Sequence, residues 1–125
     1  MRIIKNLLWL LLLLPISAFS QNALVGEWKF EVPSEDGKMI PVKLKIDTES
    51  YTVDFGMDGA IDIKGNYTVA GNEMTIQDTG GEGACLNTKG VYKFEIKDNS
   101  LTMTKVTDTC EGRSGPEGKM VFQKM

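Results

Sequence analysis

The chain alternates apolar and polar residues with a period of two from about Val25 to its end. Trp28, Phe30 and Val32 alternate with charged neighbours in the first such segment. The other alternating segments cover residues 40–46, 51–55, 61–69, 74–78, 91–96, 101–106 and 119–124. A period of two is typical of a strand that buries one face, and no stretch after residue 24 keeps helical spacing. The pattern therefore predicts eight strands.

Turn residues separate these segments, and most of the connections are short. Gly65 interrupts the fourth segment and predicts a bulge or bend there. An all-β, up-and-down antiparallel sheet closed into an eight-stranded barrel fits best, because closure removes exposed strand edges. A two-sheet sandwich is the alternative fold.

The N-terminus has the features of a signal peptide over residues 1–20. Arg2 and Lys5 precede an unbroken apolar run from Leu7 to Leu14, and Ala18-Phe19-Ser20 offers small residues for cleavage. The run is too short to span a bilayer, which takes about 20 apolar residues. We therefore expect an exported protein, periplasmic or secreted, with one domain over residues 21–125 and no membrane span after cleavage.

Two cysteines, Cys85 and Cys110, flank a predicted hairpin. If Ile96 faces Leu101 across the turn, the register brings the cysteines within a couple of residues of each other. In an oxidising compartment this placement predicts a disulfide. Closing such a loop stabilises a small domain by about 3.5 kcal/mol on chain-entropy grounds.

Composition excludes several classes of function. The chain holds 14 basic and 17 acidic residues, so loss of Arg2 and Lys5 leaves 12 against 17, a net charge of −5. An acidic chain without basic runs argues against nucleic-acid binding. The absence of histidine removes the commonest metal ligand and general base. Asp54, Asp58 and Asp62 lack the spacing of a calcium loop. We expect no enzyme activity, no cofactor and no metal.

Several short motifs resemble those of small exported bacterial lipocalin-like (calycin-type) domains. Gly26-Glu27-Trp28 is similar to the Gly-x-Trp signature that opens lipocalins. The remaining motifs lie in the C-terminal half, at residues 65–69, Cys85, 90–92, 101–104 and 108–113. The resemblance implies an eight-stranded barrel and often a small apolar ligand.

The resemblance also implies a basic residue packed over the signature Trp28. Strand order places Arg113 before the eighth strand, at the wrong end of the barrel for this role. Lys124 ends the last strand and is better placed to meet Trp28 through a cation–π contact. Gly26, Trp28 and Lys124 are therefore the predicted structural residues.

In an up-and-down barrel, successive connections alternate between the two ends. The two longest connections, near residues 79–89 and 107–118, therefore lie at the same end. Nine of the thirteen glycines and most of the net negative charge gather there. Binding residues usually lie on loops held by a rigid scaffold, so this is the expected functional end. Asp108 and Arg113 are expected on its rim.

Whether the barrel interior is filled or open decides between the candidate functions. An eight-stranded barrel is just wide enough to be filled by side chains or to hold one small ligand, and many bulky inward residues favour filling. If a pocket exists, alternation predicts five lining residues: Tyr51, Phe55, Tyr67, Met74 and Tyr92. The first hypothesis is a monomeric, non-enzymatic barrel that binds a small apolar or amphipathic molecule.

The alternative hypothesis is a protein-binding module, such as an inhibitor of an exported protease. An acidic rim would dock a basic partner. A flexible segment from Gln21 to Leu24, free to enter a partner's cleft, would support it.

Overall fold

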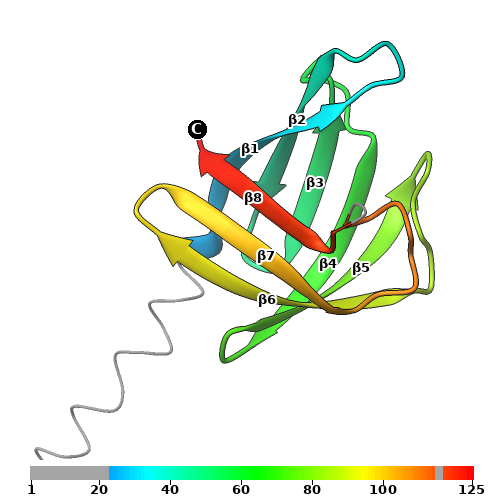
Figure 1. The fold of residues 1–125 in the computed structure, drawn as a ribbon. Helices are drawn as coiled ribbons and strands as arrows, with labels where there is room; N and C mark the ends of the chain where they lie inside the picture. Colours follow the sequence, from blue (N-terminus) through cyan, green and yellow to red (C-terminus); the bar gives the residue numbers. More distant parts are fainter. Residues whose placement is uncertain (1–22, 115–116) are drawn as a thin grey trace, which may run out of the picture.

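The computed structural model describes residues 23–114 and 117–125, which form a closed antiparallel barrel with strands in chain order (Figure 1). The predicted signal peptide, its cleavage site and Gln21 lie outside the described residues. The strands are β1 (Gly26–Pro33), β2 (Met39–Ile46), β3 (Ser50–Phe55), β4 (Ile63–Ala70), β5 (Glu73–Gly81), β6 (Lys89–Lys97), β7 (Ser100–Thr107) and β8 (Lys119–Lys124). The predicted fold is confirmed. None of the described segments is a helix long and apolar enough to cross a membrane.

The barrel closes through a short pairing of β1 with β8, in which Trp28 faces Lys124. The Lys124 ammonium nitrogen lies 5.6 Å from the centroid of the Trp28 ring. Ile96 faces Leu101 across the β6–β7 hairpin, the register that the sequence predicted. The Cys85–Cys110 disulfide is present, with Cα atoms 6.1 Å apart.

Gly65 marks a register shift between β4 and β5, as the interrupted pattern predicted. A methyl group at this position would overlap the ring of Tyr51, which lies across the glycine from the neighbouring strand. The missing side chain therefore lets the bulky Tyr51 turn inward beside β4.

One end of the barrel, which we call the short-loop end, carries the connections 47–49, 71–72 and 98–99. It is closed by side chains with at most 1% exposure: Leu24, Trp28, Ile46 and Leu101. The Trp28 indole Nε1 donates a hydrogen bond to the Leu24 carbonyl at 3.0 Å, so the residues just before β1 fold over this end. The interior is densely packed here.

The opposite end, the long-loop end, carries the connections 34–38, 56–62, 82–88 and 108–118. Several strand boundaries differ from expectation. β5 continues to Gly81, and Ile61 lies in a loop with 55% of its surface exposed. The expectation that Ile61 belongs to a strand was wrong, because β4 begins only at Ile63 and Ile61 lies in the turn built around Asp54, Asp58 and Asp62.

Candidate ligand cavity

A cavity of about 720 Å³ opens into the barrel from the long-loop end. Its walls are mostly apolar side chains of the strands: Phe30, Val32, Val42, Leu44, Val53, Ile63, Met74, Ile76, Met103, Met120 and Phe122. Residues of the long loops complete the lining, including Glu82, Cys85, Cys110, Arg113 and Glu117. None of the four residues that close the short-loop end lines it.

The cavity corrects the expectation of a filled interior. The bulky inward residues are present, but many of them, including Phe30, Met74 and Met103, form the cavity walls and leave the space between them open. Phe30 and Phe122 pack with ring centroids 5.2 Å apart, and both rings face the cavity without filling it. A volume of about 720 Å³ lies within the usual range of small-molecule sites.

Three of the five predicted lining residues, Tyr51, Phe55 and Met74, do line the cavity. Phe55 stands at the mouth, with 44% of its surface exposed. Tyr67 and Tyr92 are not in the lining. The Tyr67 hydroxyl instead donates a hydrogen bond to the Asp47 carbonyl, at 2.5 Å, toward the short-loop end.

Two buried aspartates link the disulfide to the barrel wall. Asp78 accepts hydrogen bonds from the Tyr51 hydroxyl at 2.5 Å and from the Cys85 backbone N–H at 2.9 Å. Asp108 accepts the Tyr92 hydroxyl at 2.5 Å and the Cys110 N–H at 3.0 Å. The backbone N–H of each cysteine therefore bonds to an aspartate, and the same aspartate accepts a hydrogen bond from a tyrosine hydroxyl.

Arg113 holds the two long loops together from below the mouth. Its Nε lies 3.4 Å from Asp108 Oδ2, and its Nη2 donates to the Thr88 carbonyl at 2.9 Å. Weaker bonds reach the carbonyls of Ile76 and Cys85. The rim positions expected for Asp108 and Arg113 are not found, because their side chains pair and are only 0% and 9% exposed.

The surroundings of Tyr51 and Tyr92 make their hydroxyls weaker acids than an ordinary tyrosine. Burial, and then the hydrogen bond to Asp78, raises the pKa of Tyr51 far above its ordinary value. Burial and the bond to Asp108 raise the pKa of Tyr92 in the same way. Both tyrosines therefore act as hydrogen-bond donors at neutral pH, positioned beside or behind the cavity wall.

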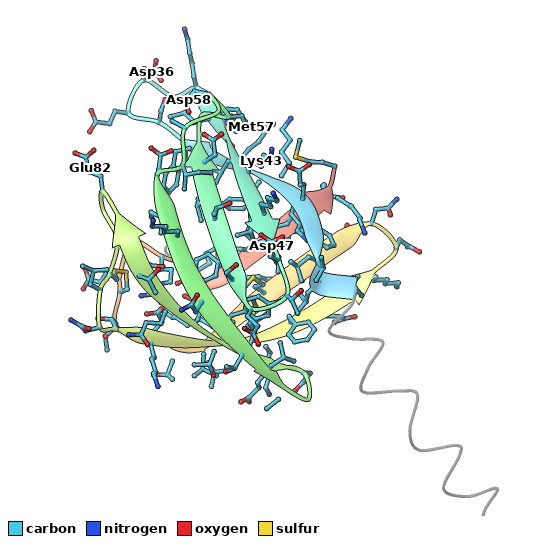
Figure 2. All side chains as sticks on the ribbon, turned by 180° about the vertical axis from the view of Figure 1, so that it is seen from behind. Asp36, Lys43, Asp47, Met57, Asp58 and Glu82 are labelled. Carbon is cyan, nitrogen blue, oxygen red and sulfur yellow. A yellow bond between two sulfur atoms is a disulfide. The ribbon has the colours of Figure 1, made fainter. Side chains whose placement is uncertain are left out.

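Exposed acids surround the mouth above this buried network. Figure 2 shows Asp36, Asp58 and Glu82 on loops of the long-loop end. Glu82 and Glu117 belong to the cavity lining itself. The predicted acidic end therefore lies around the entrance to the interior.

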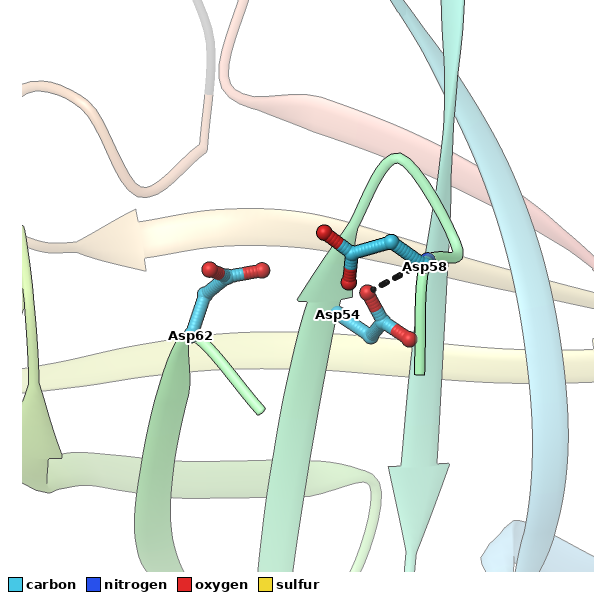
Figure 3. A group of neighbouring side chains, drawn as sticks. All are labelled: Asp54, Asp58 and Asp62. Carbon is cyan, nitrogen blue, oxygen red and sulfur yellow. Dashed lines mark hydrogen bonds between the residues drawn. The ribbon is translucent and has the colours of Figure 1, made fainter. Parts of the chain in front are cut away.

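Asp54, Asp58 and Asp62 come together in the β3–β4 connection, with one carboxylate oxygen of each within 4.8 Å of the others (Figure 3). Asp54 accepts the N–H groups of Asp58 and Gly59 at 3.2 and 3.0 Å. The Ala60 N–H holds the pKa of Asp58 below its ordinary value. These bonds make the aspartates the internal scaffold of the turn.

Asp78 is the cavity residue that the sequence reasoning missed. It lies on β5 two residues after Ile76 and four after Met74, so it shares their inward parity. It is 5% exposed and lines the cavity. The signal was present in the alternation, since Asp78 falls within the predicted segment 74–78, but the lining candidates were chosen among apolar and aromatic residues only.

No family model, no curated protein and no solved structure matches this chain.

Proposed function

We propose that the protein is an exported, non-enzymatic, lipocalin-like barrel that binds one small apolar or amphipathic molecule at its long-loop end. The observation that carries the proposal is the cavity of about 720 Å³ with apolar walls and an open mouth. Apolar walls with a few placed polar groups are the usual composition of a small-molecule site. Tyr51, Asp78 and Arg113 supply such groups here.

Export is supported by two independent features. Residues 1–20 have the charge and apolar pattern of a bacterial signal peptide. The disulfide joins Cys85 to Cys110, and such bonds persist in oxidising compartments.

A binding role is favoured over catalysis by the state of the polar groups. Tyr51 and Tyr92 both have raised pKa values, so they keep their protons and donate hydrogen bonds to aspartates. Neither is suited to act as a base near neutral pH. The same groups are well suited to hold the loops in one shape.

The N-terminal segment does not support the alternative hypothesis of a protease inhibitor. Its free end, Gln21, lies outside the described residues. Leu24 is fully buried, and its carbonyl is held by Trp28. The part of the segment that the structure describes is anchored in the barrel.

Fluorescence titration with Nile red, a neutral dye that brightens in apolar sites, tests the proposal. We expect saturable binding with one site per chain. Leu44→Trp should abolish it, because Leu44 lines the cavity and the larger ring would occupy it. Val106→Trp is the matched control, since Val106 is half exposed and outside the lining.

Binding that Leu44→Trp leaves unchanged would place the dye outside the barrel and overturn the proposal. Absence of saturable binding to the unmodified protein would overturn it as well. Circular dichroism of both variants establishes that they keep the strand content of the parent.

A further inference from the structure

We propose that the cavity selects molecules whose polar end is a cation, an alkylammonium group attached to an apolar body, and discriminates against organic anions. This inference rests on the proposed function and adds the chemical class of its ligand. It follows from how the charged groups inside the long-loop end are paired.

Asp78 is a buried carboxylate without a counter-ion among the described residues. It is 5% exposed, and no Lys or Arg nitrogen within residues 23–114 and 117–125 lies within 4.0 Å of it. Its two bonds come from the neutral Tyr51 hydroxyl and the Cys85 N–H. Buried charges are ordinarily paired, so this carboxylate is able to accept a cation.

Asp78 also has free acceptor capacity. A carboxylate offers about four lone-pair positions over its two oxygens, and the observed bonds use one on each oxygen. Because Asp78 lines the cavity, a ligand inside can reach the remaining positions. An ammonium group has three donors and no acceptor, which suits this arrangement.

Arg113 is the nearest candidate for binding an anion, but its charge is paired with Asp108 and both of its Nη atoms donate to backbone carbonyls, so that only its buried Nε lacks a hydrogen bond among the described residues. Its side chain is 9% exposed, lies beside Asp108 and donates to the carbonyls of Thr88, Cys85 and Ile76. Asp78 and Asp108 together outnumber it, so this buried trio carries a net charge of −1. An organic anion would enter next to an unpaired negative charge.

The mouth adds to the same preference. Glu82 and Glu117 line the entrance and face one cation there, Lys119. Added to Asp78 and Arg113, the lining residues carry three acids and two bases. A negative lining of this kind raises the local concentration of cations and lowers that of anions.

A matched series of eight-carbon compounds tests the inference: octylamine, 1-octanol and octanoic acid displacing Nile red at pH 7. The tail is constant, and the head is cationic, neutral or anionic at this pH. We expect octylamine to bind at least about tenfold more tightly than octanoate, with octanol between them. Equal affinities, or tighter binding of octanoate or octanol than of octylamine, would overturn the inference while leaving cavity binding intact.

Variants then locate the preference. Asp78→Asn removes the charge with little change in shape and should lower the octylamine-to-octanoate ratio at least about fivefold. Glu82→Gln, on the exposed mouth, should lower it by about twofold, since solvent screens that charge. Glu95→Gln, on the outside of β6, should leave the ratio unchanged.

If Asp78→Asn fails to fold, the comparison of Glu82→Gln with Glu95→Gln decides. Equal ratios in those two proteins would contradict the inference. If Nile red itself does not bind the unmodified protein, the proposed function fails first, and the ligand class fails with it.

Discussion

The two ends of this barrel are built from the same alternating strands but are stabilised in different ways. At the short-loop end, tight hairpins bring Leu24, Trp28, Ile46 and Leu101 into a packed cluster with almost no exposed surface. At the long-loop end, the interior is open and the loops are held by polar contacts. Apolar packing closes one end, whereas a disulfide and buried hydrogen bonds shape the other.

The difference explains how a small barrel can hold both a stable core and a cavity. An empty space forfeits the dispersion contacts that its walls would make, so its cost must be offset elsewhere. Here the Cys85–Cys110 disulfide and the bonds of Asp78, Asp108 and Arg113 fix the loops around the space. The mouth is therefore preorganised and does not depend on a ligand for its shape.

Removing the disulfide should have the largest effect on stability. The double variant Cys85→Ser and Cys110→Ser should lower the thermal midpoint by more than about ten degrees, since roughly 3.5 kcal/mol of stabilisation is lost. Nile red affinity should fall with it, because both cysteines line the cavity. Differential scanning calorimetry measures the first effect and fluorescence titration the second.

The reduced wild-type protein serves as the control for that variant, and the two midpoints should agree. An unchanged midpoint in both would mean that the long-loop end is held by its hydrogen bonds alone.

A matched pair of leucines compares the two ends directly. Leu101→Ala, in the packed cluster, should cost about 3 kcal/mol of unfolding free energy, within the range for fully buried leucines. Leu44→Ala, which faces the cavity and is only partly buried, should cost about 1 kcal/mol. Urea denaturation gives both values, and equal costs would contradict an open long-loop end.

Alkaline pH should weaken the long-loop end through its tyrosines. In the folded protein the pKa values of Tyr51 and Tyr92 are raised, so both stay protonated when the unfolded chain begins to lose these protons near pH 10. The unfolded state then binds fewer protons, and stability falls as pH rises above about 10. The double variant Tyr51→Phe and Tyr92→Phe should show a shallower decline in urea denaturation between pH 9 and 11.5. A decline as steep as that of the parent would show that these hydroxyls do not carry the dependence.

The smallest predicted effect lies at the closure of the barrel. Lys124→Met removes the cation over Trp28 and should cost about 0.5–1 kcal/mol. Lys97→Met, on an exposed position with no aromatic contact, is the control and should change stability less. If urea denaturation shows that both variants lose the same free energy of unfolding, the cation–π contact does not contribute to stability.

The barrel and its disulfide were predictable because both follow from local pattern. The period of two defines the strands, and the pairing of Ile96 with Leu101 sets the register that brings the cysteines together. Gly65 revealed the bulge for a similar reason, since a strand interior rarely accepts glycine without a geometric need.

The cavity was not predictable, since alternation assigns residues to a face but does not say how far across the interior they reach. Tyr51 and Tyr67 share inward parity, yet one lines the cavity and the other bonds to a turn at the short-loop end. The burial of Asp108 and Arg113 was missed because charged loop residues are usually solvated. Besides pairing with each other, they bond to Tyr92 and to carbonyls between residues 76 and 88, which no local pattern reveals.

The central claim is that a ligand enters the long-loop half of the barrel and leaves the short-loop half undisturbed. Amide and indole NMR spectra recorded during titration with 1-octanol, whose uncharged head makes the test independent of ligand charge, examine it most directly. We predict saturable shifts at Phe30, Met74 and Ile76, with the Trp28 indole and the Leu101 amide unmoved. Shifts centred on Trp28 and Leu101, or no saturable shift at the cavity residues, would contradict the account.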